Sequence, residues 1–299
     1  MEKEEAILKV KRGYLNGDFQ YFHLADRKSL EFESHYHEFN KIIIFISGDV
    51  TYLIEGKAYK LKPWDLLFVG SNDVHRPIIS ADEPYERIII WVNSRFLELH
   101  NVEGSNLLTC FSFSSRKKIN LLTLMPENVN SIKATLASLE EAVNDNSFGS
   151  AILKNSLFLQ FIVYINRLYL AVKTNKEESD VEYDKRISSI LEYINKNLGD
   201  DLSVENIASK FYMSKYYLMH KFKTQTGYTL HNYIQQKRLM LSASLIKKGK
   251  QITEVSLECG FKDYSSFVRA FKKTFDLSPK QYYKTMLEME NSYDMKKHR

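Results

Sequence analysis

The sequence predicts a multidomain α+β protein. An N-terminal β-barrel of short strands is followed by two helices, and a C-terminal all-α domain holds two helix-turn-helix units joined by a linker helix. Three observations lead to this fold class. After about Asn120 the spacing of apolar residues changes from the period of strands to that of helices. A helical unit then occurs twice in the last third of the chain. Positive charge is concentrated in that same third.

The charge is divided unevenly along the 299 residues. Residues 184–299 carry 21 lysines and arginines against 12 aspartates and glutamates, a net charge of +9. Residues 1–183 carry 21 against 25, a net charge of −4. A basic part behind an acidic part suggests a module for a polyanion joined to a module with another task.

The first predicted domain, residues 1–120, is a barrel of short antiparallel strands. Its strands are separated by closely spaced turn residues, as in Ser47-Gly48-Asp49 and Glu55-Gly56-Lys57. The expected strands are Lys41–Ile46, Val50–Ile54, Ala58–Leu61, Asp65–Val69, His75–Ile79 and Arg87–Trp91.

Residues 121–173 are predicted to form two helices, the first opening at Pro126. The second is apolar over more than one stripe, so it should be buried on more than one side. One interpretation packs it against its own barrel, and the other makes it a dimer interface around Leu157, Phe161 and Leu168. Residues 174–183 are polar and charged and are predicted to form the linker to the last domain, residues 184–299.

Each repeat in residues 184–299 has the pattern of a polar capping residue, an apolar helix, a turn, a second cap and a basic helix. In the first unit Ser203 caps the helix Val204–Lys210 and Ser214 caps the next one. In the second unit, which starts at Ile252, Asp263 is the second cap. A helix from about Leu230 to Lys247 connects the two units, which fixes the separation of their second helices.

The second helix of each unit is expected to face DNA. Leu218 and Phe222, four residues apart, should face the core, as should Phe267 and Phe271. Arginine can pair with guanine at two points, tyrosine and valine can touch a thymine methyl, and lysine suits phosphates. The outward residues, and candidate DNA contacts, are Lys215, Tyr216, Met219, His220 and Lys223 in the first unit and Tyr264, Ser265, Val268, Arg269 and Lys272 in the second.

Residues 184–285 resemble the DNA-binding domain of the AraC/XylS family of transcription regulators. The sequence departs from the family pattern at Tyr212 and Asp276, where glycine is usual, and at Tyr283, where arginine is common. Family members read DNA with both second helices, which implies base contacts by His220 and Arg269 above all. The resemblance rests on Ile207-Ala208, Ser214, Tyr217-Leu218, Phe222-Lys223, Thr226-Gly227, Tyr233, Arg238-Leu239, Ala243, Leu245-Ile246, Gly260-Phe261, Phe267, Phe271-Lys272 and Ser278-Pro279-Lys280-Gln281-Tyr282.

Residues 13–92 resemble a cupin barrel, the sensor domain of many members of this family. His35, His37 and His75 have the order of the histidine ligands of metal-binding cupins, but Lys41 stands where the carboxylate ligand is expected. Trp64 likewise replaces a usual glycine. Because an ammonium group beside a divalent cation is unfavourable, we expect no metal and no cofactor. His35, His37, Lys41 and His75 are instead candidate contacts for a small polar ligand.

The predicted function is that of a ligand-responsive transcription regulator, not an enzyme. Its expected partners are double-stranded promoter or operator DNA, a small-molecule effector for which a sugar is one candidate, a second copy of the chain, and RNA polymerase. A metal-dependent cupin enzyme fused to a DNA-binding module is one alternative. A constitutive DNA-binding protein with a barrel used only for dimerisation is another. With no signal peptide or membrane span and two distant cysteines, Cys110 and Cys259, the chain is expected to be cytoplasmic.

Overall fold

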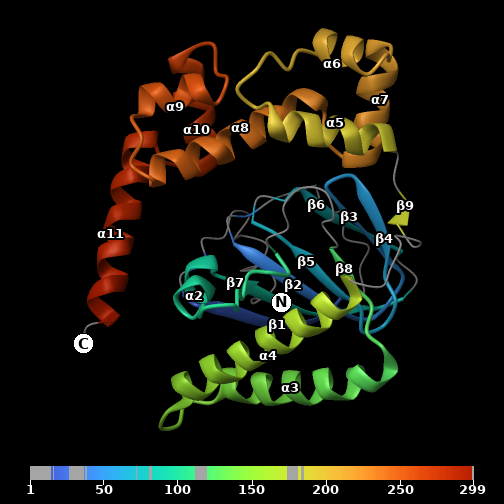
Figure 1. Cartoon of the computed structure of the whole chain (residues 1–299), viewed down its shortest axis with the longest axis vertical. Helices are drawn as coiled ribbons and strands as arrows, with labels where there is room; N and C mark the ends of the chain where they lie inside the picture. The colour runs from blue at the N-terminus through green and yellow to red at the C-terminus, as the bar shows by residue number, and fades with distance from the viewer. Residues whose placement is uncertain are drawn as a thin grey trace. The chain divides into compact units, whose positions relative to one another are not determined.

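The computed structural model describes Leu15 and residues 17–26, 37, 39–71, 73–80, 83–111, 120–173, 181–182 and 185–297. The chain divides into two compact units, Met1–Tyr183 and Asp184–Arg299 (Figure 1). His35, one of the expected ligand contacts, lies outside the described residues, as does most of the expected linker.

The first unit is built on two antiparallel sheets. A five-stranded sheet has the order β1-β7-β2-β5-β8, and a four-stranded sheet has the order β6-β3-β4-β9. Every predicted strand between residues 41 and 91 is present, within a few residues of its expected bounds. The strands are β1 (Phe19–Asp26), β2 (Asn40–Ser47), β3 (Val50–Ile54), β4 (Lys57–Lys60), β5 (Leu66–Val69), β6 (His75–Ile79), β7 (Tyr85–Val92), β8 (Leu121–Leu122) and β9 (Val181–Glu182).

Strand β2 is covered on both faces, which explains its continuous apolar sequence. Ile42 and Ile44 belong to a core shared with the helices of this unit. Ile43 and Phe45 point the other way, into a core between the two sheets. Because side chains alternate along a strand, Lys41 is on the same side as Ile43 and Phe45 and faces the interior of the barrel.

Two long helices cover the outer face of the five-stranded sheet (Figure 1). Helix α3 (Pro126–Asn144) begins with Pro126 in its first turn, as expected, and α4 (Ser150–Lys173) returns antiparallel to it after a short loop. A short helix, α2 (Ser94–Leu99), follows β7 and contributes Phe96 and Leu97 to the same core.

Helix α4 corrects one expectation from the sequence. The prediction that Phe161 points outward into a dimer interface is wrong, because this residue is fully buried in the core of its own unit. Leu157 and Leu168 are half-buried against that core. The apolar residues that α4 exposes are others: Ile152, Leu153, Val163 and Leu170. An apolar sequence on several sides of a helix predicts burial but does not say which side meets which neighbour.

The second unit is entirely helical in the residues described. Its helices are α5 (Lys185–Lys196), α6 (Val204–Lys210), α7 (Lys215–Thr226), α8 (Leu230–Lys247), α9 (Ile252–Glu258), α10 (Tyr264–Phe275) and α11 (Pro279–Lys297). The expected bounds of α6 and α8 are confirmed. The expected side-chain cap at the start of the second repeat is wrong, because the N-cap of α9 is Gln251, whose side chain makes no capping hydrogen bond.

A membrane span is not found in the part of the chain that the structure describes, since none of its helices is both long and apolar enough.

Candidate nucleic-acid interface and sensor site

The first helix-turn-helix unit consists of α6 and α7, each opened by a serine cap. Ser203 Oγ accepts a hydrogen bond from the Asn206 amide at 3.4 Å, and Ser214 Oγ accepts one from the Tyr217 amide at 3.2 Å. Helix α7 ends at Gly227, whose φ of 79° is the left-handed conformation that closes many helices. Leu218 and Phe222 are fully buried, as predicted, so they fix which face of α7 is turned outward.

The outward face of α7 is more aromatic than basic. Tyr216 is 77% exposed, and its ring stacks on that of His220 with centroids 6.2 Å apart. Met219 is 46% exposed. The ammonium group of Lys215 lies 2.5 Å from Glu205 on α6, so this cation is partly neutralised within the unit. Lys223 is exposed one turn beyond Met219. The face can offer apolar contact, an imidazole and a terminal cation.

The second helix-turn-helix unit consists of α9 and α10, and its second helix has a stronger cap. The carboxylate of Asp263 accepts hydrogen bonds from the amides of Ser265 at 3.3 Å and Ser266 at 2.7 Å. Hydrogen bonding from Ser266 above all lowers the pKa of Asp263, so the cap remains ionised at neutral pH. Phe267 and Phe271 are fully buried and in edge-to-face contact at 5.6 Å, as the sequence predicted.

Four of the five expected contacts on α10 are exposed: Tyr264, Ser265, Arg269 and Lys272. Val268 is the exception, since it is half-buried and packs against the core that α10 forms with α8, α9 and α11. Arg269 donates from Nη2 to Ser266 Oγ at 3.3 Å, which directs its guanidinium along the outward face. This face therefore differs from that of α7, because it carries an exposed arginine with several donors to offer.

In the N-terminal compact unit, Met1–Tyr183, the expected ligand contacts meet inside the barrel. Lys41 Nζ on β2 lies 3.0 Å from His75 Nε2 on β6, so the contact joins the two sheets. His75 Nδ1 lies 3.0 Å from the carbonyl oxygen of Asp73. A carbonyl only accepts, so Nδ1 carries the proton and Nε2 accepts from Lys41. Burial, and then the positive charge of Arg87, lower the pKa of Lys41 to about 7.

His37 completes the cluster from the chain before β2. Its ring lies flat on Phe39 at 4.1 Å and meets the edge of His75 at 4.9 Å. Its Nδ1 atom lies 2.5 Å from the carbonyl oxygen of Phe39. The phenol ring of Tyr52 on β3 also stacks on His75, with ring centroids 6.2 Å apart. Amine, imidazole and aromatic groups together suit a small polar ligand.

Three further polar residues of the interior were not predicted: Arg87, Asp26 and Tyr52. Arg87 and Asp26 form a buried ion pair, and the guanidinium lies 4.2 Å above the Tyr85 ring. The alternation of β7 could have revealed Arg87, because Tyr85, Arg87 and Ile89 share one face of the strand. The partner on β1 could not have been found this way, since it lies far away in sequence.

The residues described do not fit the metal site of metal-binding cupins. No group of three histidine, cysteine, aspartate or glutamate side chains comes together among them. At the place of the expected carboxylate, the Lys41 amine already donates to His75 Nε2, which is the nitrogen a metal would need. No step of the function below is therefore assigned to a metal.

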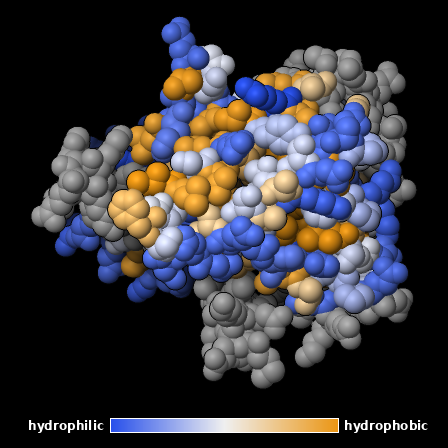
Figure 2. Space-filling model, turned by 90° about the horizontal axis from the view of Figure 1, so that it is seen from below, coloured by the Kyte–Doolittle hydropathy of each residue, from blue (hydrophilic) through white to orange (hydrophobic). Residues whose placement is uncertain are grey.

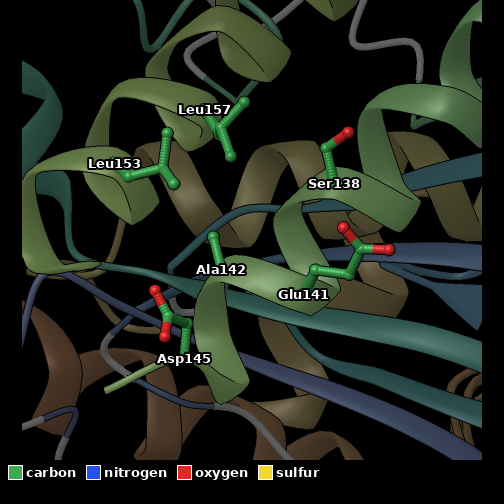
Figure 3. A pocket seen from close by; sticks show the side chains of 6 residues that line it. All are labelled: Ser138, Glu141, Ala142, Asp145, Leu153 and Leu157. Atoms are coloured by element: carbon green, nitrogen blue, oxygen red, sulfur yellow. The ribbon is translucent and has the colours of Figure 1, made fainter. Parts of the chain in front are cut away.

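A separate groove of about 440 Å³ lies between α3 and α4. Figure 3 shows its two sides, with Leu153 and Leu157 from α4 opposite residues of α3 and the end of that helix. The lining is partly apolar and partly acidic, and only Ala142 is buried. The remaining lining residues are Ser138, Glu141 and Asp145.

Two helix-turn-helix units share one connecting helix, and they follow a separate barrel domain along the chain. This arrangement defines a two-domain DNA-binding protein. Comparisons with known proteins make this more specific. Residues 207–285 match the model of a helix-turn-helix domain, and residues 25–92 match the model of a cupin domain. The chain belongs to the AraC/XylS family of transcription regulators and carries a cupin-type ligand-binding domain at its N-terminal end.

Among similar proteins is the HTH-type transcriptional activator RhaS of Klebsiella pneumoniae (strain 342), 24% identical over 253 residues, which are 83% of this chain and 86% of that protein. RhaS of Escherichia coli O6:H1 is 23% identical over 255 residues, covering 84% and 87% of the two chains. Among solved structures, ToxT from Vibrio cholerae matches over 90% of this chain and 99% of its own, at 19% identity and a TM-score of 0.37.

Proposed function

We propose that this protein regulates transcription by binding promoter DNA with both helix-turn-helix units, under the control of a small polar ligand bound in the barrel. The observation that carries the proposal is the Lys41–His75 contact, which places a buried amine and an imidazole from opposite sheets at one point of the interior. We take the site of action to be the cytoplasm, where the promoter DNA lies, and we assign no catalytic step to the chain.

On DNA, α7 and α10 enter consecutive turns of the major groove, which lie roughly 34 Å apart. Arg269 and His220 read bases, whereas Lys223 and Lys272 contact phosphates. The aromatic face of α7 favours thymine methyl groups through Tyr216 and Met219. Arg269 on α10 favours guanine. The two halves of the operator are therefore expected to differ in composition.

In the barrel, Lys41, His75 and His37 donate to or accept from the ligand. Such a ligand is neutral or anionic, because the Lys41 amine, with a pKa of about 7, is protonated in part of the molecules at neutral pH, and a bound anion would favour its charged form. A sugar is one candidate for this set of hydrogen-bonding and aromatic groups. To regulate, the ligand must bind one arrangement of the protein more tightly than another, because equal affinities shift nothing.

One contact supports a route from the barrel to the DNA-binding domain. Strand β9 lies just before the C-terminal unit in the sequence, forms the edge of the four-stranded sheet and pairs antiparallel with β4, with Ala58 opposite Glu182 and Tyr59 opposite Val181. The buried Tyr59 hydroxyl donates to Asn120 at 3.2 Å inside the barrel. A ligand that moves β4 would alter the strand that leads into the DNA-binding domain.

Dimerisation is assigned to the outer face of α4. Ile152, Val163 and Leu170 are 75%, 37% and 47% exposed. Val163 follows Ile152 by about three helical turns and Leu170 follows Val163 by about two, so the three side chains lie on one stripe of the helix. Figure 2, seen from below, shows apolar side chains gathered on the side of the first unit that carries α3 and α4. A dimer would place two DNA-binding domains on one promoter, where RNA polymerase is the further partner.

The test of ligand control is a thermal-stability screen of the full chain against metabolites. A true ligand at about a hundred times its dissociation constant should stabilise the folded state by roughly 2.7 kcal/mol. His75→Ala and His37→Ala should abolish this response and leave DNA binding intact. His23→Ala is the matched control, since His23 lies on the other side of the barrel wall, beside Glu140 of α3. A response that survives His75→Ala would exclude the site.

A further inference from the structure

The two helix-turn-helix units touch each other directly, away from the helix that connects them. The loop after α5, at Leu198-Gly199, leads into the first helix-turn-helix unit, on which α5 packs through the contact of Tyr193 with Phe211 at 5.8 Å. The turn between α9 and α10, at Gly260, belongs to the second helix-turn-helix unit. A methyl group placed on Gly260 would lie 2.6 Å from the Leu198 carbonyl oxygen, and one on Gly199 would lie 2.8 Å from the Glu258 carbonyl oxygen. Both distances are shorter than any side chain allows, so the two backbones approach as only glycine permits.

Arg238, in the middle of α8, closes this contact. Its Nε donates to the Leu198 carbonyl at 2.9 Å, and its Nη2 donates to the Asp200 carbonyl at 2.6 Å. The same guanidinium lies against Gly260, 2.7 Å from where its side chain would begin. These carbonyls follow the C-terminal end of α5, where the helix dipole favours a cation. One side chain therefore binds the loop of the first unit and supports the turn of the second.

The position of Arg238 along α8 matters because each half of this helix holds one unit. On the N-terminal side, Tyr233 meets Phe222 of α7 edge-on at 5.5 Å. On the C-terminal side, Leu239 and Ile246 join the core formed with Phe267 and Phe271 of α10. Without a direct contact, a bend of α8 between these halves would swing α7 relative to α10.

We infer that Arg238, Gly199 and Gly260 form a lock that joins the two helix-turn-helix units into one rigid body. The lock would fix the spacing of the two boxes, meaning the two short DNA segments that α7 and α10 contact. This inference rests on the proposed reading of DNA by both units. Arg238 is a positioning residue and needs no contact with DNA. When the lock is intact, binding of one unit presents the other at a high effective concentration. When it is broken, the second unit must be oriented anew.

The experiment uses the full chain and a duplex selected from random sequences by the wild-type chain. Companion duplexes have either box scrambled, or five base pairs inserted between the boxes so that they face opposite sides of the helix. Arg238→Ala and Gly199→Ala are compared with wild type. Lys247→Ala is the control, since it removes an exposed positive charge from the same helix without touching the loop after α5. Melting temperatures are recorded for every variant.

The wild-type chain should bind the two-box duplex at least about tenfold more tightly than either one-box duplex or the duplex with the insertion. Arg238→Ala and Gly199→Ala should lose most of that advantage while their affinity for one-box duplexes stays within about twofold of wild type. Lys247→Ala should keep the full ratio.

An unchanged ratio and unchanged spacing preference in both lock variants would overturn the inference. A parallel loss on one-box and two-box duplexes would also overturn it, because that would indicate a DNA contact or general unfolding. Gly199→Ala keeps the test open if Arg238→Ala fails to fold. Equal binding of all duplexes by the wild-type chain would instead contradict the proposed two-unit reading itself.

Discussion

The Lys41 ammonium group donates to His75 Nε2 at 3.0 Å across the interior of the barrel, from a strand of one sheet to a strand of the other. The residues described place no carboxylate within ion-pair distance of this amine, so its charge is stabilised only by a neutral imidazole. Such an arrangement costs folding free energy in the absence of a ligand.

The first prediction concerns this cost. Because the pKa of Lys41 falls from 10.5 to about 7 in the folded state, the unfolded chain binds more protons between these values, and stability rises with pH. Lys41→Met should remove this contribution. At pH 7 the variant should be more stable than wild type, and its advantage should shrink by up to about 1.4 kcal/mol per pH unit towards pH 10.

Urea unfolding followed by tryptophan fluorescence measures this in the first unit alone, because the two tryptophans of the chain, Trp64 and Trp91, both lie there. Ile43→Met is a control for altered packing on the same strand. Parallel stability curves for wild type and Lys41→Met from pH 7 to pH 9 would show that Lys41 is not destabilised by burial.

The second prediction concerns the turn of the first helix-turn-helix unit. Tyr212 has a φ of 52° and is 97% exposed, so its backbone is strained while its side chain buries almost no surface. Tyr212→Gly should stabilise the C-terminal compact unit, Asp184–Arg299, by about 1 kcal/mol, whereas Tyr212→Ala, which keeps the strain, should have little effect. Thermal unfolding followed by circular dichroism compares them. Equal melting temperatures for the glycine and alanine variants would contradict the strain.

The third prediction separates base reading from phosphate binding on α10. Arg269→Ala should cost about 1–3 kcal/mol on the selected duplex and relax preference at one base pair, whereas Lys272→Ala should weaken all sequences alike. Competition binding against a panel of single-base variants measures both. If Arg269→Ala lost equal affinity on selected and random duplexes, Arg269 would be a phosphate contact only.

The fourth prediction concerns the dimer. Val163→Glu should give a folded monomer, because Val163 is on the exposed stripe of α4. Phe161 is two residues away and fully buried. Phe161→Ala should instead destabilise the N-terminal compact unit, Met1–Tyr183, by about 3–5 kcal/mol without a specific effect on dimerisation. Analytical ultracentrifugation and circular dichroism distinguish the two. A Val163→Glu variant that remains dimeric would place the interface elsewhere.

The elements that the sequence predicted well are those with local causes. The serine and aspartate caps at Ser203, Ser214 and Asp263 start their helices through bonds within three residues, and the bounds of α6 follow. Turn residues with few conformations likewise delimit the strands. Of the departures from family patterns, Tyr212, Trp64 and Asp276 all adopt positive φ, so the turns persist although glycine is absent.

The features that the sequence did not predict depend on distant residues. Nothing in the apolar pattern of α4 shows that Phe161 points towards the sheet, because several sides of this helix are apolar. Arg87 meets Asp26 from another strand, and Arg238 meets carbonyls about forty residues earlier in the chain. In the sequence Arg238 is only part of a family pattern, and its role follows from the backbone approach of Gly199 and Gly260.

Residues 184–299 should form a DNA-binding domain that reads DNA with two helix-turn-helix units, and the most direct test is the binding of this segment alone to duplex DNA over a range of salt concentrations. The segment should bind at low salt, and its affinity should fall steeply and log-linearly as salt rises, since lysine and arginine contacts release counterions from phosphates. A folded segment that shows no binding to duplex DNA at low salt would contradict it.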